Sequence, residues 1–427
     1  MTDELVVLMG DAVAGHLTRA SGGSLRLEYD DSYRDNESAT ALSVSLPLEV
    51  RAHTDRAVTP WLWGLLPDNE AVLARWSRAF HVSAASPFSL LTSPVGQDCA
   101  GAVRFISPDR LDEALRREGD VEWLDEADVA ARLRDLQADA TAWLGTDFSG
   151  RFSLAGAQAK TALLLRDERW GLPSGAMATS HILKPAILGF DDHDLNEHLC
   201  LRAAQLSGLV CASSRVTSFE DQSAVVVTRY DRLEREDGSL IRIHQEDLCQ
   251  ALGRHPGQKY QAEGGPTSND IVGLLRGAMP ASASEPAVWR FFDAVTFNWL
   301  ICGTDAHSKN YSLLLSGRQV RLAPLYDIAS ALPYPGMPHQ KVRMAMTFGG
   351  SYKVMARDAT MWPRVAAEFG LGRDDVVGRA RALIEKVPDA FAEAARERPI
   401  QQLASRLPTT LVDAVVERVK RCADTVR

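Results

Sequence analysis

The 427-residue sequence lacks the marks of an exported, membrane or zinc-clustered protein. Its six cysteines are scattered, without a Cys-x-x-Cys pair or a histidine at zinc-ligand spacing, so we expect reduced thiols. The N-terminus, MTDELVVLMGD, carries acids where a signal peptide carries Lys or Arg. The longest apolar segment, 291–303, is shorter than the roughly 20 residues of a membrane span. We therefore expect a cytoplasmic protein that does not contact membranes.

An excess of positive charge is also missing. Asp and Glu (56) outnumber Lys and Arg (47), which gives a formal net charge of -9. Such a chain has no overall basic field with which to hold nucleic acid phosphates, so direct DNA binding by the whole surface is disfavoured. Apolar residues at 45% and charged residues at 24% are typical of a folded globular protein, and the length predicts two or three structural units.

The periodicity of apolar residues changes along the chain. Alternation over 4–30 predicts short strands, and spacing of three and four over 60–140 predicts helices. From residue 148 three strand-like stretches follow, RFSLAG, KTALLLRDERW and TSHILKP, and then a helix at 196–209 and the strand QSAVVVTRYD. Helices dominate from residue 248, including a buried one that we expect Ser284 to begin.

This order predicts an α+β fold that is bilobal and protein-kinase-like, with a small β-rich N-lobe and an all-helical C-lobe. We expect three domains. They are an N-terminal subdomain of strands and helices (1–145), a β-rich nucleotide-binding part of the N-lobe (146–232) and a helical C-lobe with the catalytic loop (233–427).

The strongest chemical pattern is GTDAHSKN at 303–310, followed by LYDI at 325–328. Phosphoryl transfer needs one carboxylate to orient the acceptor hydroxyl, and an amide oxygen and a second carboxylate to hold magnesium. Asp305, Asn310 and Asp327 supply these groups, and four residues separate the first two, as in the kinase pattern H-R-D-x-x-x-x-N. The hexapeptide alone would suit an ordinary polar loop; the buried helix before it and the hairpin after it favour catalysis.

Residues that could bind a nucleotide precede this pattern in the order that a kinase requires. The small residues of SLAGAQAK (153–160) would let backbone N–H groups approach phosphates, although one glycine makes the motif weak by itself. Lys184 in an apolar strand could contact the α- and β-phosphates, with Glu197 as its ion-pair partner. Thr228, Arg229 and Tyr230 follow AVVV, where an interlobe hinge would hydrogen-bond adenine.

The segment His244-Gln245-Glu246-Asp247, with Cys249 close by, invites interpretation as a metal site. No second His or Cys lies at ligand spacing, so we favour a structural or cleft-lining role.

Several blocks in one order resemble the HipA-type serine/threonine kinases, the toxins of bacterial type II toxin–antitoxin systems. The resemblance covers nearly the whole chain. Its blocks are FSLAGAQAKTALL (152–164), HILKP (181–185), NEHLCLRAAQLSGL (196–209), VTRYDR (227–232), RIHQEDLCQALG (242–253), KYQAEGGP (259–266), NWLICGTDAHSKNYSLLL (298–315) and LAPLYDIASALPYP (322–335).

The resemblance implies an ATP- and Mg²⁺-dependent enzyme with Asp305 as the catalytic base and Asn310 and Asp327 on magnesium. It also marks Ser153 as the site of autophosphorylation, which would place negative charge in a loop that must approach phosphates and so switch the kinase off. The nucleotide contacts that it implies are Ala155, Gly156, Ala157, Gln158, Ala159, Lys160, Lys184, Thr228, Arg229, Tyr230, His307, Asn310, Tyr326 and Asp327.

Two positions depart from a well-known member of the family. Ala159 stands where that member has Glu, and Thr228 replaces an acid, so nucleotide affinity is expected to differ. Neither position belongs to the phosphotransfer triad.

The family implies partners as well. They are a HipB-like helix-turn-helix antitoxin, operator DNA reached mainly through that antitoxin, and a protein substrate such as the glutamyl or another aminoacyl-tRNA synthetase, whose phosphorylation stops translation and causes growth arrest and persistence. Two other functions stay open from the residues alone: a catalytically weak corepressor scaffold, and a small-molecule or lipid kinase.

Overall fold

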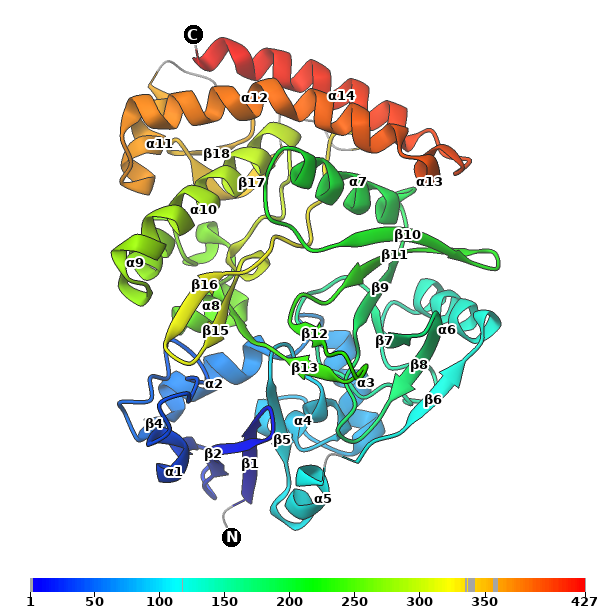
Figure 1. The fold of residues 1–427 in the computed structure, drawn as a ribbon, viewed down its shortest axis with the longest axis vertical. Coiled ribbons are helices and arrows are strands. Elements are labelled where there is room, and N and C mark those ends of the chain that lie inside the picture. Colours follow the sequence, from blue (N-terminus) through cyan, green and yellow to red (C-terminus); the bar gives the residue numbers. More distant parts are fainter. Residues whose placement is uncertain (1–2, 117, 335, 337–341, 356–359, 427) are drawn as a thin grey trace. The chain divides into compact units, whose positions relative to one another are not determined.

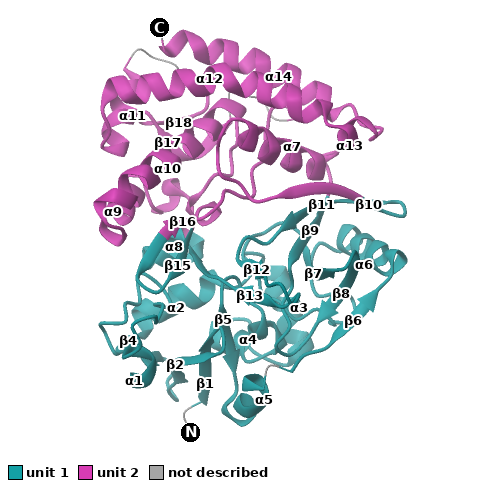
Figure 2. Cartoon of the chain, in the orientation of Figure 1, with its two compact units in different colours: residues 1–185, 218–257, 313–320 teal, residues 186–217, 258–312, 321–427 magenta. Residues whose placement is uncertain are grey.

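The computed structural model describes residues 3–426 except 117, 335, 337–341 and 356–359, so Pro335 at the end of the last motif lies outside the described residues. The chain forms two compact units (Figures 1 and 2). Unit 1 comprises 1–185, 218–257 and 313–320, and unit 2 comprises 186–217, 258–312 and 321–427. The expected division into three domains remains a prediction.

The first sheet of unit 1 confirms the strands expected over 4–30. Its order is β4-β3-β2-β1-β5, and all of its neighbouring pairs are antiparallel. Alternation places Leu5, Val7, Leu17 and Leu27 on one buried face, each at most 1% exposed. The strands are β1 (Asp3–Met9), β2 (Ala12–Arg19), β3 (Leu25–Tyr29), β4 (Ala52–Thr54) and β5 (Val103–Ile106).

The second sheet carries the expected nucleotide-binding segments and has the order β10-β11-β9-β7-β8-β6. Two expectations need correction here. RFSLAG is not a strand but forms an isolated parallel bridge between Cys99 and Ser153, and VEWL, expected as helix, is the edge strand β6. The strands are β6 (Val121–Leu124), β7 (Thr161–Arg166), β8 (Arg169–Pro173), β9 (His181–Pro185), β10 (Ser214–Phe219) and β11 (Gln222–Thr228).

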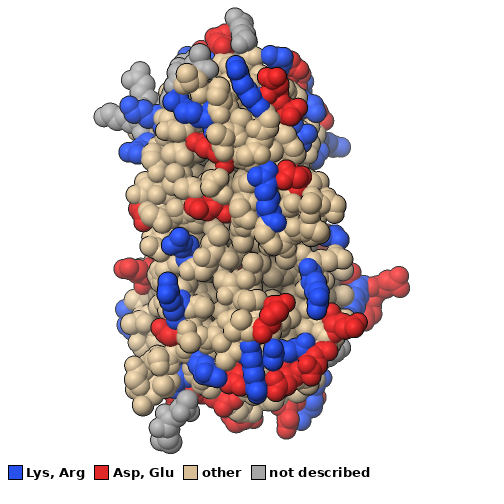
Figure 3. All heavy atoms as spheres, turned by 90° about the vertical axis from the view of Figure 1, so that its left-hand side faces the viewer, with Lys and Arg blue, Asp and Glu red and all other residues tan. Residues whose placement is uncertain are grey.

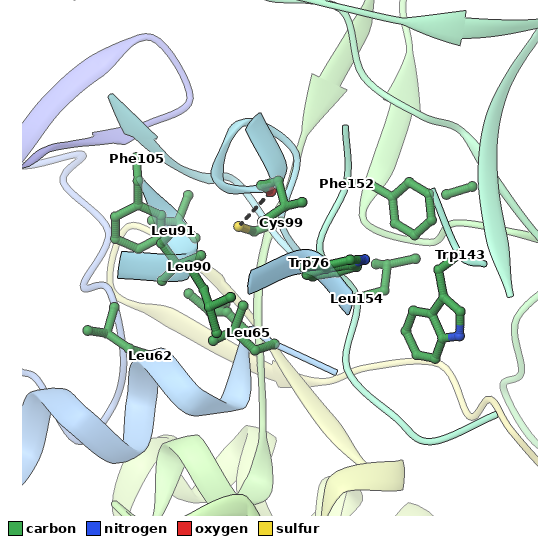
Figure 4. Close-up of a cluster of buried hydrophobic side chains, with 14 of the residues drawn as sticks. Leu62, Leu65, Trp76, Leu90, Leu91, Cys99, Phe105, Trp143, Phe152 and Leu154 are labelled. Atoms are coloured by element: carbon green, nitrogen blue, oxygen red, sulfur yellow. Dashed lines mark hydrogen bonds between the residues drawn. The ribbon is translucent and has the colours of Figure 1, made fainter. Parts of the chain in front are cut away.

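One hydrophobic cluster joins the two sheets of unit 1 (Figure 4). Trp61, Trp76 and Trp143 are its largest members, all fully buried, and they come from the helices and loops between the sheets. The described helices of unit 1 are α1 (Asp31–Arg34), α2 (Asp55–Gly64), α3 (Glu70–Phe80), α4 (Pro87–Leu91), α5 (Leu111–Leu115), α6 (Glu126–Ala138) and α8 (Leu248–Ala251). Short strands also lie in it, the last two only in part: β12 (Arg232–Glu234), β13 (Leu240–Arg242), β14 (His244–Asp247), β15 (Ser312–Ser316) and β16 (Gln319–Leu322).

Unit 2 is mostly helical, with one hairpin. Its central helix α10 begins at Ala281 after Pro280, three residues before the expected start, so Ser284 is a buried side chain inside the helix and not its cap. The helices are α7 (His193–Leu206), α9 (Ser268–Ala278), α10 (Ala281–Ile301), α11 (Met361–Phe369), α12 (Arg373–Arg396), α13 (Arg398–Gln401) and α14 (Leu407–Ala423), and the hairpin is β17 (Arg343–Phe348) with β18 (Ser351–Lys353).

The surface shows no separation of charge on the face drawn in Figure 3, where Lys and Arg side chains are interspersed with Asp and Glu. That face therefore offers no broad basic field, in keeping with the net charge of -9. Among the described residues, no helix is both long and apolar enough to cross a bilayer.

His244 and Glu246 serve the packing of unit 1. The Nε2 of His244 donates to the carbonyl of Leu42 at 2.9 Å, and the Glu246 carboxyl contacts Ser43 Oγ at 2.5 Å and accepts from the Val44 amide at 2.7 Å. Both side chains are buried. Burial raises the pKa of Glu246 to about 8, so the folded chain holds a proton there that the unfolded chain releases near 4.5.

We predict that Glu246 makes the protein less stable as the pH rises towards 8.5. A raised pKa contributes stability that is complete below the unfolded value and is lost as the pH passes through the folded value. His198 and His244, whose pKa burial lowers to about 4, act in the opposite direction below pH 6.5, so the useful window is pH 6.5 to 8.5. In urea titrations, the wild type should lose about 2 kcal/mol across this window relative to Glu246→Gln. Parallel curves for the two proteins would contradict the prediction.

Candidate functional site

Ser153 lies wholly inside unit 1. Its Oγ donates to the Leu65 carbonyl at 2.7 Å, its amide donates to the Asp98 carbonyl at 3.0 Å, and the residue is 0% exposed. Phe152 and Leu154 on either side are members of the core (Figure 4). In this conformation the hydroxyl cannot meet a phosphate donor.

The loop that follows Ser153 closes back on itself. Gly156 has φ +104, a backbone conformation that favours glycine. A Cβ at this position would lie 2.6 Å from the Lys160 ammonium. That ammonium donates to the Ala155 carbonyl at 2.8 Å and stands 4.8 Å from the centre of the Trp143 ring. The Asp68 amide donates to the Gly156 carbonyl at 3.0 Å. The loop is thus anchored at both ends.

The middle of the loop, Ala157 to Ala159, is less buried than its ends. Among the described residues, the buried Nε2 of Gln158 has no hydrogen-bond partner. An unpaired amide donor in a loop of small residues suits an anionic ligand such as a triphosphate. Ala159 packs against the core as an apolar residue.

Lys184 and the segment Thr228–Tyr230 lie on neighbouring strands. Lys184 is in β9, 6% exposed, opposite Val225 of β11, and Thr228 ends β11 opposite His181. Glu197, expected to pair with Lys184, is buried in α7 of unit 2.

The side chain of Arg229 is taken up by a buried charge cluster that the sequence did not reveal. Its guanidinium donates to both carboxylate oxygens of Asp231, at 3.0 and 2.8 Å, and to Thr179 Oγ1 at 2.8 Å. The backbone amide of Arg229 donates to the Ser180 carbonyl. Asp98 and Arg232 also belong to the cluster, and the Arg232 guanidinium donates to Asp98 Oδ1 at 2.8 Å. Burial alone would raise the pKa of Asp98, but its arginine neighbours hold it well below its usual range. The Arg229 side chain is therefore part of the buried charge cluster and holds the segment Thr228–Tyr230 in place.

In unit 2 the expected catalytic loop begins where α10 ends. Cys302 adopts the left-handed conformation at φ 54, and the Gly303 amide donates to the Asn298 carbonyl at 2.7 Å. A Cβ on Gly303 would overlap the Asn298 side chain, which is itself held by the Ala294 carbonyl. This close approach requires glycine at 303.

Asp305 is the exposed member of the loop, with 65% of its side chain accessible. Tyr260 donates its hydroxyl to Asp305 Oδ1 at 2.6 Å, while Oδ2 lies 3.9 Å from His307 Nε2. The Tyr260 and His307 rings meet edge to face at 5.1 Å. One carboxylate oxygen is therefore fixed by tyrosine and the other faces the histidine edge and solvent.

The backbone of the loop is held by Asn310. Its Nδ2 donates to the Asp305 carbonyl at 2.7 Å, and that carbonyl also accepts from the His307 amide at 2.8 Å. Because the amide nitrogen is used in this way, the amide oxygen of Asn310 points elsewhere and suits a cation.

The segment that carries Asp327 is tied to the same loop. The Tyr326 hydroxyl donates to the Lys309 carbonyl and contacts Ser312 Oγ, both at 2.7 Å. Asp327 itself has φ 57, an uncommon backbone conformation for a residue other than glycine and one that clusters at functional sites. Ser330 fixes the far side by donating to the Ile301 carbonyl at 2.6 Å.

Asn310 and Asp327, which we expect to bind magnesium, offer the oxygen ligands that this ion prefers. Among the described residues, no three His, Cys, Asp or Glu side chains gather as a metal site. Magnesium, however, usually binds one or two protein oxygens together with phosphate oxygens and water. Asn310 and Asp327 match that smaller requirement.

The expected site residues therefore fall into two groups, one in each unit. Ser153, Ala155–Lys160, Lys184 and Thr228–Tyr230 belong to unit 1, and Asp305, His307, Asn310, Tyr326 and Asp327 belong to unit 2. Sequence reasoning missed the contact of Tyr260 with Asp305, although the motif KYQAEGGP contains it. This motif is the signal in the sequence that could have identified Tyr260 as a site residue.

Comparisons with known proteins cover both units. The HipA N-terminal domain matches residues 5–106 and the HipA-like C-terminal domain matches residues 152–394. The putative kinase Y4mE of Sinorhizobium fredii is 35% identical over 411 residues, 96% of each chain. The chain belongs to the HipA kinase family. This HipA-type chain also resembles the serine/threonine-protein kinase toxin HipA of Shewanella oneidensis, at 26% identity over 90% of this chain and 88% of that one.

The fold comparison agrees. HipA of Shewanella oneidensis, solved with HipB and its operator DNA, superposes with a TM-score of 0.84 at 23% identity, over 98% of this chain and 97% of that one. The predicted family and the predicted kinase-like fold class are confirmed.

We predict that Gly303→Ala weakens both folding and phosphotransfer. The added methyl group overlaps the held Asn298 side chain, and such overpacking costs about 1–3 kcal/mol. Gly273→Ala is the matched control, because its Cβ in α9 meets nothing within 4 Å and alanine favours the helix. Thermal unfolding and a kinase assay of both variants check the prediction, which a neutral Gly303→Ala would overturn.

Proposed function

We propose that this HipA-type chain transfers the γ-phosphoryl group of Mg-ATP to serine or threonine hydroxyls of proteins. The observation that carries the proposal is the geometry of the catalytic loop, in which Tyr260 and Asn310 hold Asp305 from two sides while its carboxylate stays exposed. Phosphoryl transfer depends mainly on such positioning.

Each residue then has a definite task. Asp305 Oδ2 accepts the hydrogen of the incoming hydroxyl, because Oδ1 is occupied by Tyr260. Asn310 and Asp327 would hold magnesium, which supplies charge neutralisation to the triphosphate when bound. Lys160, Lys184 and the amide of Gln158 are the donors toward phosphate, and the backbone of Thr228–Tyr230 is the expected partner of adenine.

We predict that Asp305→Asn abolishes phosphotransfer while the fold is kept. Loss of a positioned base lowers rates by about 10²–10⁴-fold. The purified chain is incubated with labelled ATP and magnesium, and Asp389→Asn on the exposed side of α12 is the control. Label that persists in Asp305→Asn, or its absence from the wild type, would reject the kinase proposal.

Ser153 is the proposed site of self-modification. A phosphate brings nearly two negative charges, which the fully buried pocket beside Leu65 cannot accept, so phosphorylation would keep the loop away from its place. Ser153→Ala should lose the label on the chain itself and still label an external acceptor. Peptide mass analysis locates the phosphate, and a label unchanged by Ser153→Ala would place the modification elsewhere.

The proposed partner is a HipB-like helix-turn-helix antitoxin, and DNA is contacted mainly through it. Support comes from the Shewanella HipA solved with HipB and operator DNA and from the net charge of -9 of this chain. We expect a stable complex when the chain is coexpressed with its operon neighbour. Intact-mass analysis checks the complex and the state of Ser153 together.

The proposed target class is the aminoacyl-tRNA synthetases, which work in the cytoplasm, with the glutamyl enzyme first. Incubation with a panel of purified synthetases should label one of them at a defined Ser or Thr. Transfer to lipids or small molecules only would contradict the protein target.

A further inference from the structure

We propose that Asp98 is the positioning residue of the nucleotide site, coupling the adenine-binding segment to the burial of Ser153. The proposal rests on the proposed kinase function, because it assumes that adenine meets Thr228–Tyr230. Asp98 belongs to neither expected set of site residues. It follows a short 3-10 turn, residues Pro94–Gln97, and is 3% exposed.

The backbone of Asp98 holds the segment around Ser153. Its carbonyl accepts the Ser153 amide at 3.0 Å, and the next residue, Cys99, forms a parallel bridge with Ser153. Ser153 leads directly into the loop 155–160. A displacement of the Asp98 backbone therefore moves the beginning of that loop.

The carboxylate of Asp98 holds the start of the lysine strand. Thr179 donates to its Oδ2 twice, from the hydroxyl at 2.7 Å and from the amide at 3.1 Å. Thr179 lies two residues before His181, the first residue of β9, the strand that carries Lys184. The Asp98 carboxylate therefore holds the residues just before the strand that carries Lys184.

The same carboxylate holds the adenine segment. Arg232 donates to Oδ1 at 2.8 Å and Arg229 donates to Oδ2 at 3.4 Å, while the Cys99 carbonyl accepts from both guanidinium groups at 3.0 Å. Arg242 lies 3.6 Å from Oδ1. The Arg229 side chain is 1% exposed, so it cannot exchange these partners for water.

Asp98 is therefore shared by the loop, the lysine strand and the adenine segment, all within unit 1. A ligand that orders one of these segments should order the others through it. Adenosine separates this coupling from direct contact, because it can bind the adenine segment but has no phosphate with which to reach the loop.

The test is amide hydrogen exchange of the full chain with and without saturating adenosine, with binding followed by calorimetry. In the wild type, adenosine should slow exchange across 152–160. Asp98→Asn should still bind adenosine but lose this protection, and without ligand its 152–160 amides should exchange about tenfold faster, as expected for loss of one charged hydrogen bond.

Two controls separate coupling from loss of stability. Val7→Ala lowers the stability of unit 1 through a buried residue of β1, a strand that carries none of the expected site residues. Asp231→Asn removes the other carboxylate that binds Arg229 and Arg232, and this carboxylate accepts from the Gly101 amide, whereas Asp98 contacts the Ser153 segment. Selective release of 152–160 by Asp98→Asn supports the proposal, and equal release by Asp231→Asn overturns it, because charge balance would then explain the effect.

If Asp98→Asn fails to fold, the adenosine experiment on the wild type alone tests the proposed coupling. Adenosine that binds without slowing exchange across 152–160 overturns the coupling and leaves the kinase proposal intact. Failure of both adenosine and ATP to bind removes the proposed function and the coupling with it.

Discussion

A buried carboxylate among arginines sets the constraint on which unit 1 depends. Asp98 and Asp231 share Arg229 and Arg232, Arg242 lies beside Asp98, and all five side chains are at most 8% exposed. Buried charges are tolerated only when their partners are in place, since an unpaired one costs several kcal/mol. Segments far apart in the sequence must therefore meet in one arrangement. We infer that the cluster contributes specificity of geometry more than stability, and that it positions the segments proposed to bind the nucleotide.

The backbone of the proposed catalytic loop in unit 2 is ordered by neutral hydrogen bonds. The left-handed end of α10, the contact of Gly303 with Asn298 and the bond from Asn310 to the Asp305 carbonyl fix the backbone. These bonds leave the carboxylate of Asp305 accessible, as its proposed role toward an incoming hydroxyl requires. A buried ion-paired carboxylate at this position would be held equally well but would be closed to substrate.

The sequence predicted the elements whose signal is local and missed those that depend on distant partners. Alternation located β1 to β3, and the interval between Asp305 and Asn310 is the local signal on which the proposed catalytic loop rests. Phe152 and Leu154 alternate like a strand but are buried in the core without forming one, because burial alone produces the same pattern. The charge cluster could not be found, since Asp98 and Arg232 are 134 residues apart. The expected role of Arg229 rested on its position after a strand, which says nothing of where the side chain turns.

The burial of Ser153 bears on how often the proposed self-modification could occur. Releasing Ser153 breaks its bonds to Leu65 and Asp98, worth about 1 kcal/mol each, and the flanking Phe152 and Leu154 leave the core at about 1.5–3 kcal/mol each. A cost of this size keeps the released state to a small fraction of molecules, so phosphorylation of Ser153 would be slow beside that of an exposed acceptor. The segment around Ser153 meets the charge cluster through the backbone of Asp98 and Cys99. Because coupling is reciprocal, the proposed role of Asp98 means that release of this segment also loosens the adenine-binding segment.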